Sequence, residues 1–273
     1  MKKFKDVIEL RTQLNELMPN IDGDADADWI ISTLLNIKRS EIRKGVQVPE
    51  KICKKAYKLA KMRSTGKPLT QILSNAEFFG YKFFVNQEVL SPRFETELLV
   101  DIVSKFYKSG VGLDIGTGSG VIAISLNKHF GLEMYASDIS KSALKVAKKN
   151  QVSLNTNVKF ILSDMFKQIG DLKFDFIVSN PPYIRTEVIK TLDPEVQDHE
   201  PIIALDGGSD GLKFYRIIAE ESPKFLKEGG MLFLEIGYDQ AEEVENLLKP
   251  NFKDIQVKKD YSGKDRIVYA YKK

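Results

Sequence analysis

The sequence predicts an α/β protein in which a small helical bundle precedes a doubly wound, mostly parallel sheet. Five short apolar runs, GVGLDIG, LEMYASD, VKFILSD, FDFIVSN and MLFLEIG, each end in Gly, Asp or Asn, and helical segments separate most of them. Strands that alternate with helices are typical of a parallel sheet whose ligand site lies at the carboxyl ends of the strands. The final runs, FKDIQVKKD and RIVYAYKK, predict an antiparallel pair at one edge of that sheet.

The chain before Lys67 lacks runs that are typical of strands and predicts short helices. Apolar residues recur at helical spacing around Trp29 and again from Ile52 to Ala60. Asp22 and Asp24 are the expected caps of the first of these helices, and Trp29 is expected in the bundle core. We therefore expect a helical domain over residues 1–67, a linker and β-hairpin over 68–90, and the sheet-bearing domain over 91–273.

Composition excludes several classes of protein. The chain has 273 residues, of which 42% are hydrophobic and 29% charged, as in an ordinary globular protein, and its net charge of +3 identifies no partner. The single cysteine, Cys53, excludes an intramolecular disulfide, and only His129 and His199 could supply imidazole ligands. We expect no metal and a reducing, cytoplasmic environment. No uncharged run approaches the roughly 20 residues of a membrane span, and we expect no export signal.

The segment LDIGTGSG places a strand directly before a glycine turn that opens the helix VIAISLNKHF. Glycine lets a ligand approach the backbone closely. The candidate ligand-binding residues of this turn are Asp114, Gly116, Thr117, Gly118, Ser119 and Gly120. A glycine cluster alone is weak support, because a strand-to-helix turn also uses one without any ligand.

Acidic residues close the next two strands. Asp138 follows the glycines by roughly 20 residues, where a carboxylate can accept both hydroxyls of a ribose. Asp164 and Met165 close the third strand, where a hydrogen bond and an apolar face could hold an adenine. Each Asp taken singly could be a helix cap or a turn residue. Together these strand ends predict an adenosine-containing cofactor.

Glycine spacing separates two cofactor classes. The NAD fingerprint is G-x-G-x-x-G, whereas this turn is G-x-G-x-G with Asp114 just ahead of it. The spacing resembles class I S-adenosylmethionine-dependent methyltransferases, which implies S-adenosyl-L-methionine as cofactor and a seven-stranded, Rossmann-like sheet. Asp114 would then face the methionine amino group. An NAD-dependent oxidoreductase remains as an alternative.

The fourth strand ends in the tetrapeptide Asn180, Pro181, Pro182 and Tyr183, the NPPY motif. Two prolines in series hold the backbone around Asn180 in one extended shape. The Asn180 side-chain oxygen and the Pro181 carbonyl can then accept both hydrogens of one NH2 group and stabilise positive charge on its nitrogen. Tyr183 would stack on the planar substrate group. The motif resembles that of methyltransferases acting on adenine, guanine or glutamine nitrogens; the alternative is a proline-rich turn without a catalytic role.

Further segments resemble the release factor glutamine methyltransferase family, the HemK/PrmC group, from the Trp29 helix to the C-terminus. SPRFETE resembles the family's P-R-P-x-T-E segment, with Arg93, Glu95 and Thr96 in place and Phe94 for the second proline. The stretch from Glu200 to Gly211 resembles E-P-x-x-A-L-x-G-G-x-D-G, and LEIG followed by Gln240 continues the match. Met165 stands where many members carry an aromatic residue.

The resemblance implies methylation of the glutamine nitrogen in the Gly-Gly-Gln motif of class I peptide-chain release factors, the proteins of translation termination. Asn180 would complete the cofactor site, and Arg93, Glu95 and Glu200 would join the NPPY motif in the substrate site. The N-terminal domain would recognise the substrate, and neither nucleic acid, membrane nor metal would be required. Arg93 and Glu95 could instead form an ion pair with each other. A nucleic-acid amine methyltransferase and a non-catalytic cofactor-binding adaptor remain as alternatives.

Overall fold

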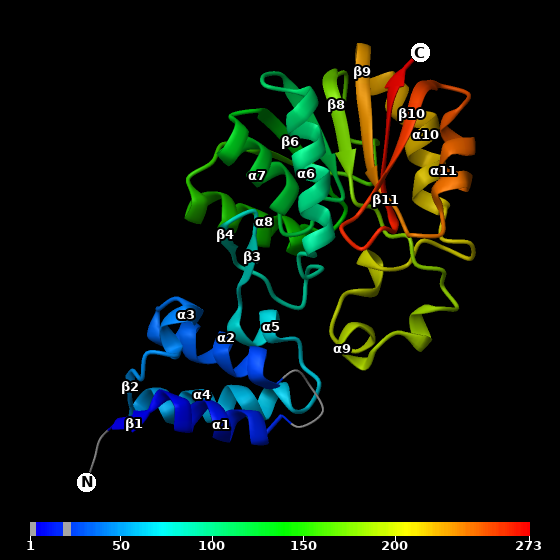
Figure 1. Cartoon of the computed structure of the whole chain (residues 1–273). Helices are drawn as coiled ribbons and strands as arrows, with labels where there is room; N and C mark the ends of the chain where they lie inside the picture. The colour runs from blue at the N-terminus through cyan, green and yellow to red at the C-terminus, as the bar shows by residue number, and fades with distance from the viewer. Residues whose placement is uncertain (1–3, 19–22) are drawn as a thin grey trace. The chain divides into compact units, whose positions relative to one another are not determined.

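The chain forms two compact units (Figure 1). The computed structural model describes residues 4–18 and 23–273. The first unit comprises residues 1–74 with 194–199, and the second comprises residues 75–193 with 200–273. The expected linker and hairpin, residues 68–90, contribute to both units.

The first unit is mainly helical. Its elements are β1 (Phe4–Asp6), α1 (Val7–Glu16), α2 (Gly23–Leu35), α3 (Arg39–Ile42), β2 (Gln47–Pro49), α4 (Glu50–Arg63), α5 (Leu69–Leu73) and α9 (Pro194–Gln197). The expected helices around Trp29 and from Ile52 to Ala60 are confirmed. However, β1 and β2 pair antiparallel. The sequence pattern missed this pair because three-residue strands are too short to show alternation.

Helices α1, α2 and α4 enclose one apolar core. Its members include Val7, Leu10, Leu14, Ala27, Ile30, Ile31, Cys53, Ala56 and Ala60. The expectation that Trp29 belongs to this core is wrong, because Trp29 is half-buried and the Arg39 guanidinium lies 4.3 Å from its ring centroid. Asp24 lies in the first turn of α2, and the other expected cap, Asp22, lies outside the described residues.

A buried arginine organises the polar contacts of the first unit. The guanidinium of Arg63 pairs with Asp26 on α2 and, at 2.7 Å, with Glu195 on α9. The side-chain amide of Gln71 donates to the backbone carbonyl of His199 over 2.6 Å. These contacts fix residues 194–199 in the first unit, although they follow the NPPY motif in the sequence.

The second unit is built on a seven-stranded sheet. Its strands are β5 (Val111–Ile115), β6 (Glu133–Asp138), β7 (Lys159–Leu162), β8 (Phe174–Ser179), β9 (Leu226–Glu235), β10 (Phe252–Lys259) and β11 (Asp265–Lys272). Their order is β10-β11-β9-β8-β5-β6-β7, with the five strands from β9 to β7 parallel and β10 and β11 antiparallel. All the strands expected from the apolar runs are confirmed, including the antiparallel edge pair.

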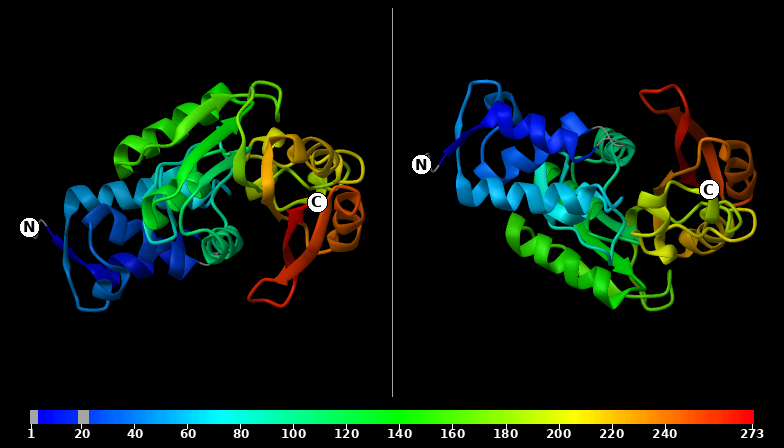
Figure 2. Two further views of the ribbon diagram at one scale, coloured as in Figure 1. Left: turned by 90° about the horizontal axis from the view of Figure 1, so that it is seen from above. Right: turned by 90° about the horizontal axis from the view of Figure 1, so that it is seen from below.

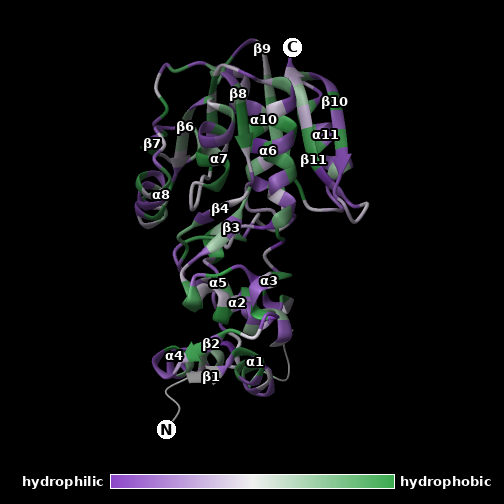
Figure 3. Ribbon diagram, turned by 60° about the vertical axis from the view of Figure 1, so that its left-hand side comes forward, coloured by the Kyte–Doolittle hydropathy of each residue, from purple (hydrophilic) through white to green (hydrophobic). Residues whose placement is uncertain are grey.

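Helices cover both faces of this sheet (Figure 1, Figure 2). The helices are α6 (Phe94–Phe106), α7 (Val121–Phe130), α8 (Lys141–Leu154), α10 (Lys213–Phe225) and α11 (Ala241–Leu248), with two 3₁₀ turns at Ile189–Thr191 and Ile202–Ala204. Phe176 packs with α6 and α7, whereas its strand neighbour Ile177 packs with α10 and α11. Successive strand residues point to opposite faces, so a strand covered on both sides reads as one continuous apolar run. In Figure 3, β8 is coloured as mainly hydrophobic, whereas α6 and α10 carry both hydrophobic and hydrophilic residues.

A short hairpin precedes the sheet. Its strands are β3 (Ala76–Phe78) and β4 (Tyr81–Phe83), as expected. Phe79 and Gly80 form the turn with φ of 50° and 77°, the left-handed pair that matches the twist of a two-residue hairpin. The unfavourable conformation of Phe79 is stabilised because its N–H donates to Glu97 Oε1 over 2.6 Å and its ring packs on His129.

Strand order opens a crevice in the second unit. After β5 the chain turns through α7 to β6, whereas after β8 it leads through α10 to β9, on the other side of β5. The loops therefore diverge at the carboxyl ends of β5 and β8, where ligands bind in doubly wound sheets. No helix in the described part of the chain is long and apolar enough to cross a membrane.

Candidate active site

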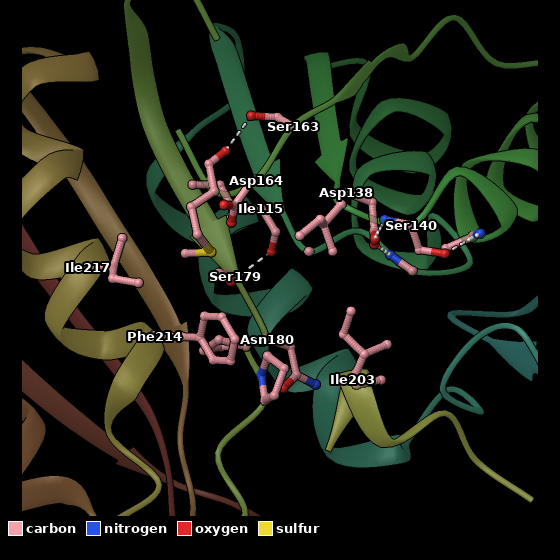
Figure 4. A pocket seen from close by; sticks show the side chains of 18 of the residues that line it. Ile115, Asp138, Ser140, Ser163, Asp164, Ser179, Asn180, Ile203, Phe214 and Ile217 are labelled. Carbon is pink, nitrogen blue, oxygen red and sulfur yellow. Dashed lines mark hydrogen bonds between the residues drawn. The ribbon is translucent and has the colours of Figure 1, made fainter. Parts of the chain in front are cut away.

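A cavity of about 790 Å³ lies at the carboxyl ends of the parallel strands (Figure 4). Strand ends supply Ile115, Gly116 and Gly118 after β5, Asp138, Ile139 and Ser140 after β6, Ser163 to Phe166 after β7, and Ser179 to Pro182 after β8. Pro201, Ile203, Ala204, Lys213, Phe214, Ile217, Glu221 and Phe225 complete much of the wall. In Figure 4, Asp138 and Ile203 lie on one side and Phe214 and Ile217 on the other. The size suits a nucleoside-sized ligand.

The three glycines of the turn have different tasks. Gly116, Gly118 and Gly120 all have positive φ, at 72°, 56° and 84°. A Cβ added to Gly116 or Gly118 would meet no atom within 4 Å, so at these positions a ligand can approach bare backbone. A Cβ on Gly120 would lie 2.8 Å from Ile124 Cδ1 and 3.2 Å from Ala147 Cβ. The third glycine therefore permits close packing of α7 against α8.

Asp138 joins the glycine turn to the next strand. Its Oδ2 accepts a hydrogen bond from the Gly118 N–H and its Oδ1 accepts one from the Ser140 N–H, both over 2.8 Å. Burial raises the pKa of Asp138 above its ordinary value. Each carboxylate oxygen keeps a second lone pair, so the group can still accept hydroxyl hydrogens from the cavity. Ile139, beside it, is exposed and offers an apolar surface.

Asp114 lies beneath the turn instead of in the cavity wall. Thr117 Oγ1 donates to Asp114 Oδ2 over 2.7 Å, and the backbone N–H of Ala123 also faces the carboxylate. Burial raises the pKa of Asp114 to about 7. Thr117, Ser119 and Gly120 are buried with it and do not line the cavity. The placement of Asp114 against an amino group stays a prediction.

The turn after β7 contributes a polar and an apolar side chain. Asp164 lines the cavity and pairs with Lys167 at 2.5 Å. Met165 has φ of 49°, and its side chain lines the same wall as Phe166. Asp164 and Met165 thus reach the cavity from the end of the third parallel strand, β7, as expected from the sequence.

Asn180 stands at the edge of the cavity with its amide nitrogen already engaged. Its Nδ2 donates to Thr96 Oγ1 over 3.1 Å, and Thr96 Oγ1 donates in turn to Glu235 Oε2 over 2.7 Å. Thr96 and Glu235 are buried. The Asn180 side-chain oxygen is therefore the end of the amide that can accept a hydrogen bond from a substrate.

The remainder of the NPPY motif divides between the cavity and the core. Pro181 and Pro182 line the cavity, whereas Tyr183 is half-buried, packs against the cluster under α10 and α11, and is absent from the lining. Burial raises the pKa of Tyr183 to about 12. Its carbonyl accepts a hydrogen bond from Gln240 Nε2 over 3.0 Å. Stacking of Tyr183 on a substrate stays a prediction.

Arg93 and Glu200 form an ion pair near the start of α6. Arg93 Nη2 donates to Glu200 Oε2 over 2.7 Å, and Glu200 Oε1 accepts the Ser91 N–H over 3.3 Å. The carboxylate partner of Arg93 is therefore Glu200, whereas Glu95 is exposed. Arg93, Glu95 and Glu200 do not line the cavity, and their role in substrate binding stays a prediction.

Sequence reasoning missed the apolar wall formed by Ile139, Ile203, Phe214 and Ile217. Helix α10 carried a usable signal, because its apolar stripe is broad. Tyr215 and Ile218 enter the core, whereas Phe214 and Ile217, at the edge of the same stripe, line the cavity. An amphipathic helix that only covers a sheet needs a narrower stripe. Within residues 4–18 and 23–273, no three His, Cys, Asp or Glu side chains gather where they could hold a metal ion.

Comparison with known proteins identifies the family. The family model "Methyltransferase small domain" matches residues 93–193, which include the glycine turn and the NPPY motif. A relative from Aquifex aeolicus named "Release factor glutamine methyltransferase" is 36% identical over 95% of this chain and 96% of its own length. One of the same name from Agrobacterium fabrum is 42% identical over 76% and 75%. The chain belongs to the release factor glutamine methyltransferase family.

The fold comparison agrees with this family. The crystal structure of a methyltransferase from Pyrococcus furiosus superposes with a TM-score of 0.54 at 22% identity, covering 71% of this chain and 90% of that one. The class I methyltransferase fold is thereby confirmed. The relatives from Aquifex aeolicus and Agrobacterium fabrum confirm the resemblance to the release factor glutamine methyltransferases. Membership of this family rules out the NAD-dependent oxidoreductase alternative.

Proposed function

We propose that this protein transfers a methyl group from S-adenosyl-L-methionine to the side-chain amide nitrogen of a glutamine in class I peptide-chain release factors, within their Gly-Gly-Gln motif. The observation that carries the proposal is the 36% sequence identity to a relative named release factor glutamine methyltransferase, over almost the full length of both chains. The position of the NPPY motif at the edge of a nucleoside-sized cavity supports it.

The residues of the cavity fit the cofactor. The bare backbone of Gly116 and Gly118 gives room for its methionine part, and the Asp138 carboxylate can accept the ribose hydroxyls. Asp164 and Met165 would hold the adenine. Asp114, buried beneath the glycine turn, would pair with the amino group as the sequence predicts. When bound, S-adenosylmethionine supplies an electrophilic methyl group on a sulfonium, whose S–C bond breaks as the methyl leaves.

An amide nitrogen is a poor nucleophile because its lone pair is delocalised into the carbonyl. The Asn180 side-chain oxygen and the Pro181 carbonyl accept both hydrogens of the substrate amide, which turns the lone pair toward the methyl group and stabilises the positive charge on nitrogen. The new N–C bond forms, and the nitrogen then releases one proton to solvent. Orientation of this kind can contribute up to ~7–11 kcal/mol of the barrier.

The substrate protein would also contact residues outside the cavity. We assign recognition to the N-terminal domain of residues 1–67 and to three residues at the start of α6: Arg93 at its N-cap, Glu95 in its first turn, and Glu200, which pairs with Arg93. The protein would act in the cytoplasm, where release factors function, without a metal, a membrane or nucleic acid.

Transfer of labelled methyl to a purified class I release factor tests the proposal. The acceptors are the wild-type factor, its Gly-Gly-Gln glutamine-to-alanine variant, bulk RNA and bulk DNA. We expect label on the wild-type factor alone. Label on nucleic acid alone would replace the substrate with an exocyclic amine, and no label on any acceptor would favour the non-catalytic adaptor.

A further inference from the structure

Two motif residues without a role in the proposed chemistry meet behind Asn180. Thr96 comes from the first turn of α6 and Glu235 from the end of β9, 139 residues apart in the sequence. Their side chains are 3% and 1% exposed. The hydroxyl of Thr96 connects them, at 2.7 Å from Glu235 Oε2 and 3.1 Å from Asn180 Nδ2.

The Thr96 hydroxyl can form a hydrogen bond with only one orientation of the Asn180 side-chain amide. Threonine has a single hydroxyl hydrogen, and in this contact Thr96 donates it to Glu235. Thr96 therefore faces Asn180 with lone pairs, which attract the NH2 end of the amide and repel its oxygen. A reversed amide would place Asn180 Oδ1 against those lone pairs and leave two buried acceptors without a donor, which is costly.

We propose that Thr96 and Glu235 are positioning residues that hold the Asn180 amide in the one orientation in which its oxygen faces the substrate. The identity of the substrate amide rests on the proposed function above, whereas the orientation of Asn180 does not. Neither residue lines the cavity, and both act on the reaction through Asn180.

The arrangement depends on the charge of Glu235. A protonated Glu235 could donate to Thr96, which would free the threonine hydrogen to turn toward Asn180 and accept either orientation of the amide. The groups that face Glu235 are Thr96 and Glu95 on α6, Asn180 and Tyr183 after β8, Tyr215 on α10, and Arg266 on β11.

These neighbours set the range over which Glu235 titrates. Burial raises the pKa of Glu235 to about 7, against the lowering effect of Thr96, of Arg266 and of the Asn180 amide that also faces the carboxylate, while Glu95 raises it further. Arg266 is itself paired with Asp260 at 3.3 Å. The kcat should therefore fall as pH falls through about 7, because protonation releases the amide.

Two substitutions of Thr96 separate positioning from packing. Thr96→Val keeps the shape and removes the hydroxyl, whereas Thr96→Ser keeps the hydroxyl and removes a methyl group. We expect Thr96→Val to lose on the order of 100-fold in kcat, as misplaced catalytic groups do, with Thr96→Ser restoring most of it. Cofactor affinity should stay within several-fold in both. The reverse order, with Ser slower than Val, would mean that Thr96 acts by packing and would overturn the proposal.

The chain offers a matched control on the same helix. Ser104 is buried on α6, and its hydroxyl donates to the Asp101 carbonyl over 2.7 Å. Ser104→Ala removes a buried hydroxyl without touching Asn180, so its kcat should equal that of the wild type. Thermal unfolding of each variant identifies any loss of kcat that comes from loss of fold.

Glu235→Gln tests the role of charge. At saturating cofactor and substrate, the wild-type kcat should fall as pH drops through about 7, and this fall should disappear in Glu235→Gln. A fall of the same size in the variant would assign it to another group and would contradict the role of Glu235.

The side-chain NH2 signals of Asn180, observed by nuclear magnetic resonance without substrate, give a readout independent of activity. We expect slow hydrogen exchange in the wild type and Thr96→Ser and fast exchange in Thr96→Val. If these signals behave so but no release factor is methylated, the proposed function fails and the positioning role stands. If Thr96→Val methylates at the wild-type rate or keeps slow exchange, the positioning role fails and the proposed function is untouched.

Discussion

The side-chain amide of Gln240 donates a hydrogen bond over 3.0 Å to the carbonyl oxygen of Tyr183. The same nitrogen lies 3.4 Å from the Gly211 carbonyl, and the Gln240 oxygen accepts the Gly237 N–H over 3.0 Å. Gln240 is buried, and a Cβ on Gly211 would lie 2.5 Å from the Tyr183 oxygen. The end of the NPPY motif is therefore held by a side chain that follows β9 and by a glycine without space for a side chain.

Gln240→Leu should loosen the NPPY motif. It leaves the Tyr183 carbonyl and the Gly237 N–H without partners, at about 1–3 kcal/mol for each buried group. We expect a lower free energy of unfolding in denaturant and a kcat reduced by roughly tenfold or more, because the Pro181 carbonyl shifts with the backbone. Gln256→Leu, at an exposed position on β10, is the control. Wild-type kcat in Gln240→Leu would show that the hydrogen bond is not needed to place the motif.

Asn180→Ala should remove most methyl transfer. It deletes an acceptor that stabilises charge on the reacting nitrogen, and loss of one such group costs about 10²–10³ in kcat. Cofactor affinity, measured by calorimetry, should stay within several-fold. Turnover at the wild-type rate would refute the proposed mechanism.

Asp138→Ala should act on cofactor binding. A charged acceptor of two hydroxyls is removed, at about 1.5–3 kcal/mol for each hydrogen bond, so the Kd should rise by at least ~10-fold. The kcat at saturating cofactor should be affected much less. Asp171→Ala, on the exposed turn before β8, is the control. An unchanged Kd would remove Asp138 from the ribose role.

Gly116→Ala and Gly120→Ala should distinguish a glycine that leaves room for a ligand from one that permits close packing of two helices. Both positions have positive φ, so each variant pays about 1–2 kcal/mol of strain. Gly120→Ala also overlaps Ile124 and Ala147, and its free energy of unfolding should fall by about 1–3 kcal/mol more. Gly116→Ala meets no protein atom, but its methyl group enters the cavity and should weaken cofactor binding. Equal stability of the two variants would contradict the packing role of Gly120.

Asp114→Asn should change how stability depends on pH. Burial raises the pKa of Asp114 from 3.8 to about 7, so the folded state holds the proton more tightly than the unfolded state. The stability that the folded state gains from this tighter proton binding is complete below pH 3.8 and is lost as pH rises through about 7. Without cofactor, the wild type should therefore lose more stability across this range than Asp114→Asn. Parallel curves for the two proteins would mean that Asp114 has an ordinary pKa.

The fold was largely predictable because both faces of the sheet are covered. A strand such as Phe174–Ser179 is apolar except for Asp175 near its start and ends in a polar residue, which marks its position and direction. Ligand-type residues at strand ends, such as Asp138 and Asn180, meet because parallel strands end at one edge. The pair β1 and β2 escaped prediction because its strands have three residues each.

Contacts between distant segments were not predictable from spacing. Trp29 has the helical periodicity of a core residue. However, Ala27 and Ile31 are the residues buried in the core, and the Arg39 guanidinium lies over the Trp29 ring. The pairing of Arg93 with Glu200 joins residues 107 positions apart, so a local partner, Glu95, looked equally suitable. The hydroxyl link from Thr96 to Glu235 spans 139 positions. Such pairs depend on how the loops return to the sheet, which no local pattern records.

The short helix α9 has a consequence for exchanging parts between relatives. Residues 194–199 leave the NPPY-bearing segment to join the first unit, so the chain passes between its units after residues 74, 193 and 199. A chain truncated to begin at residue 75 would keep Glu195 and lose its partner Arg63. A chimaera that takes its N-terminal unit from another species therefore needs two grafts, residues 1–74 and 194–199, inherited together as one recognition cassette.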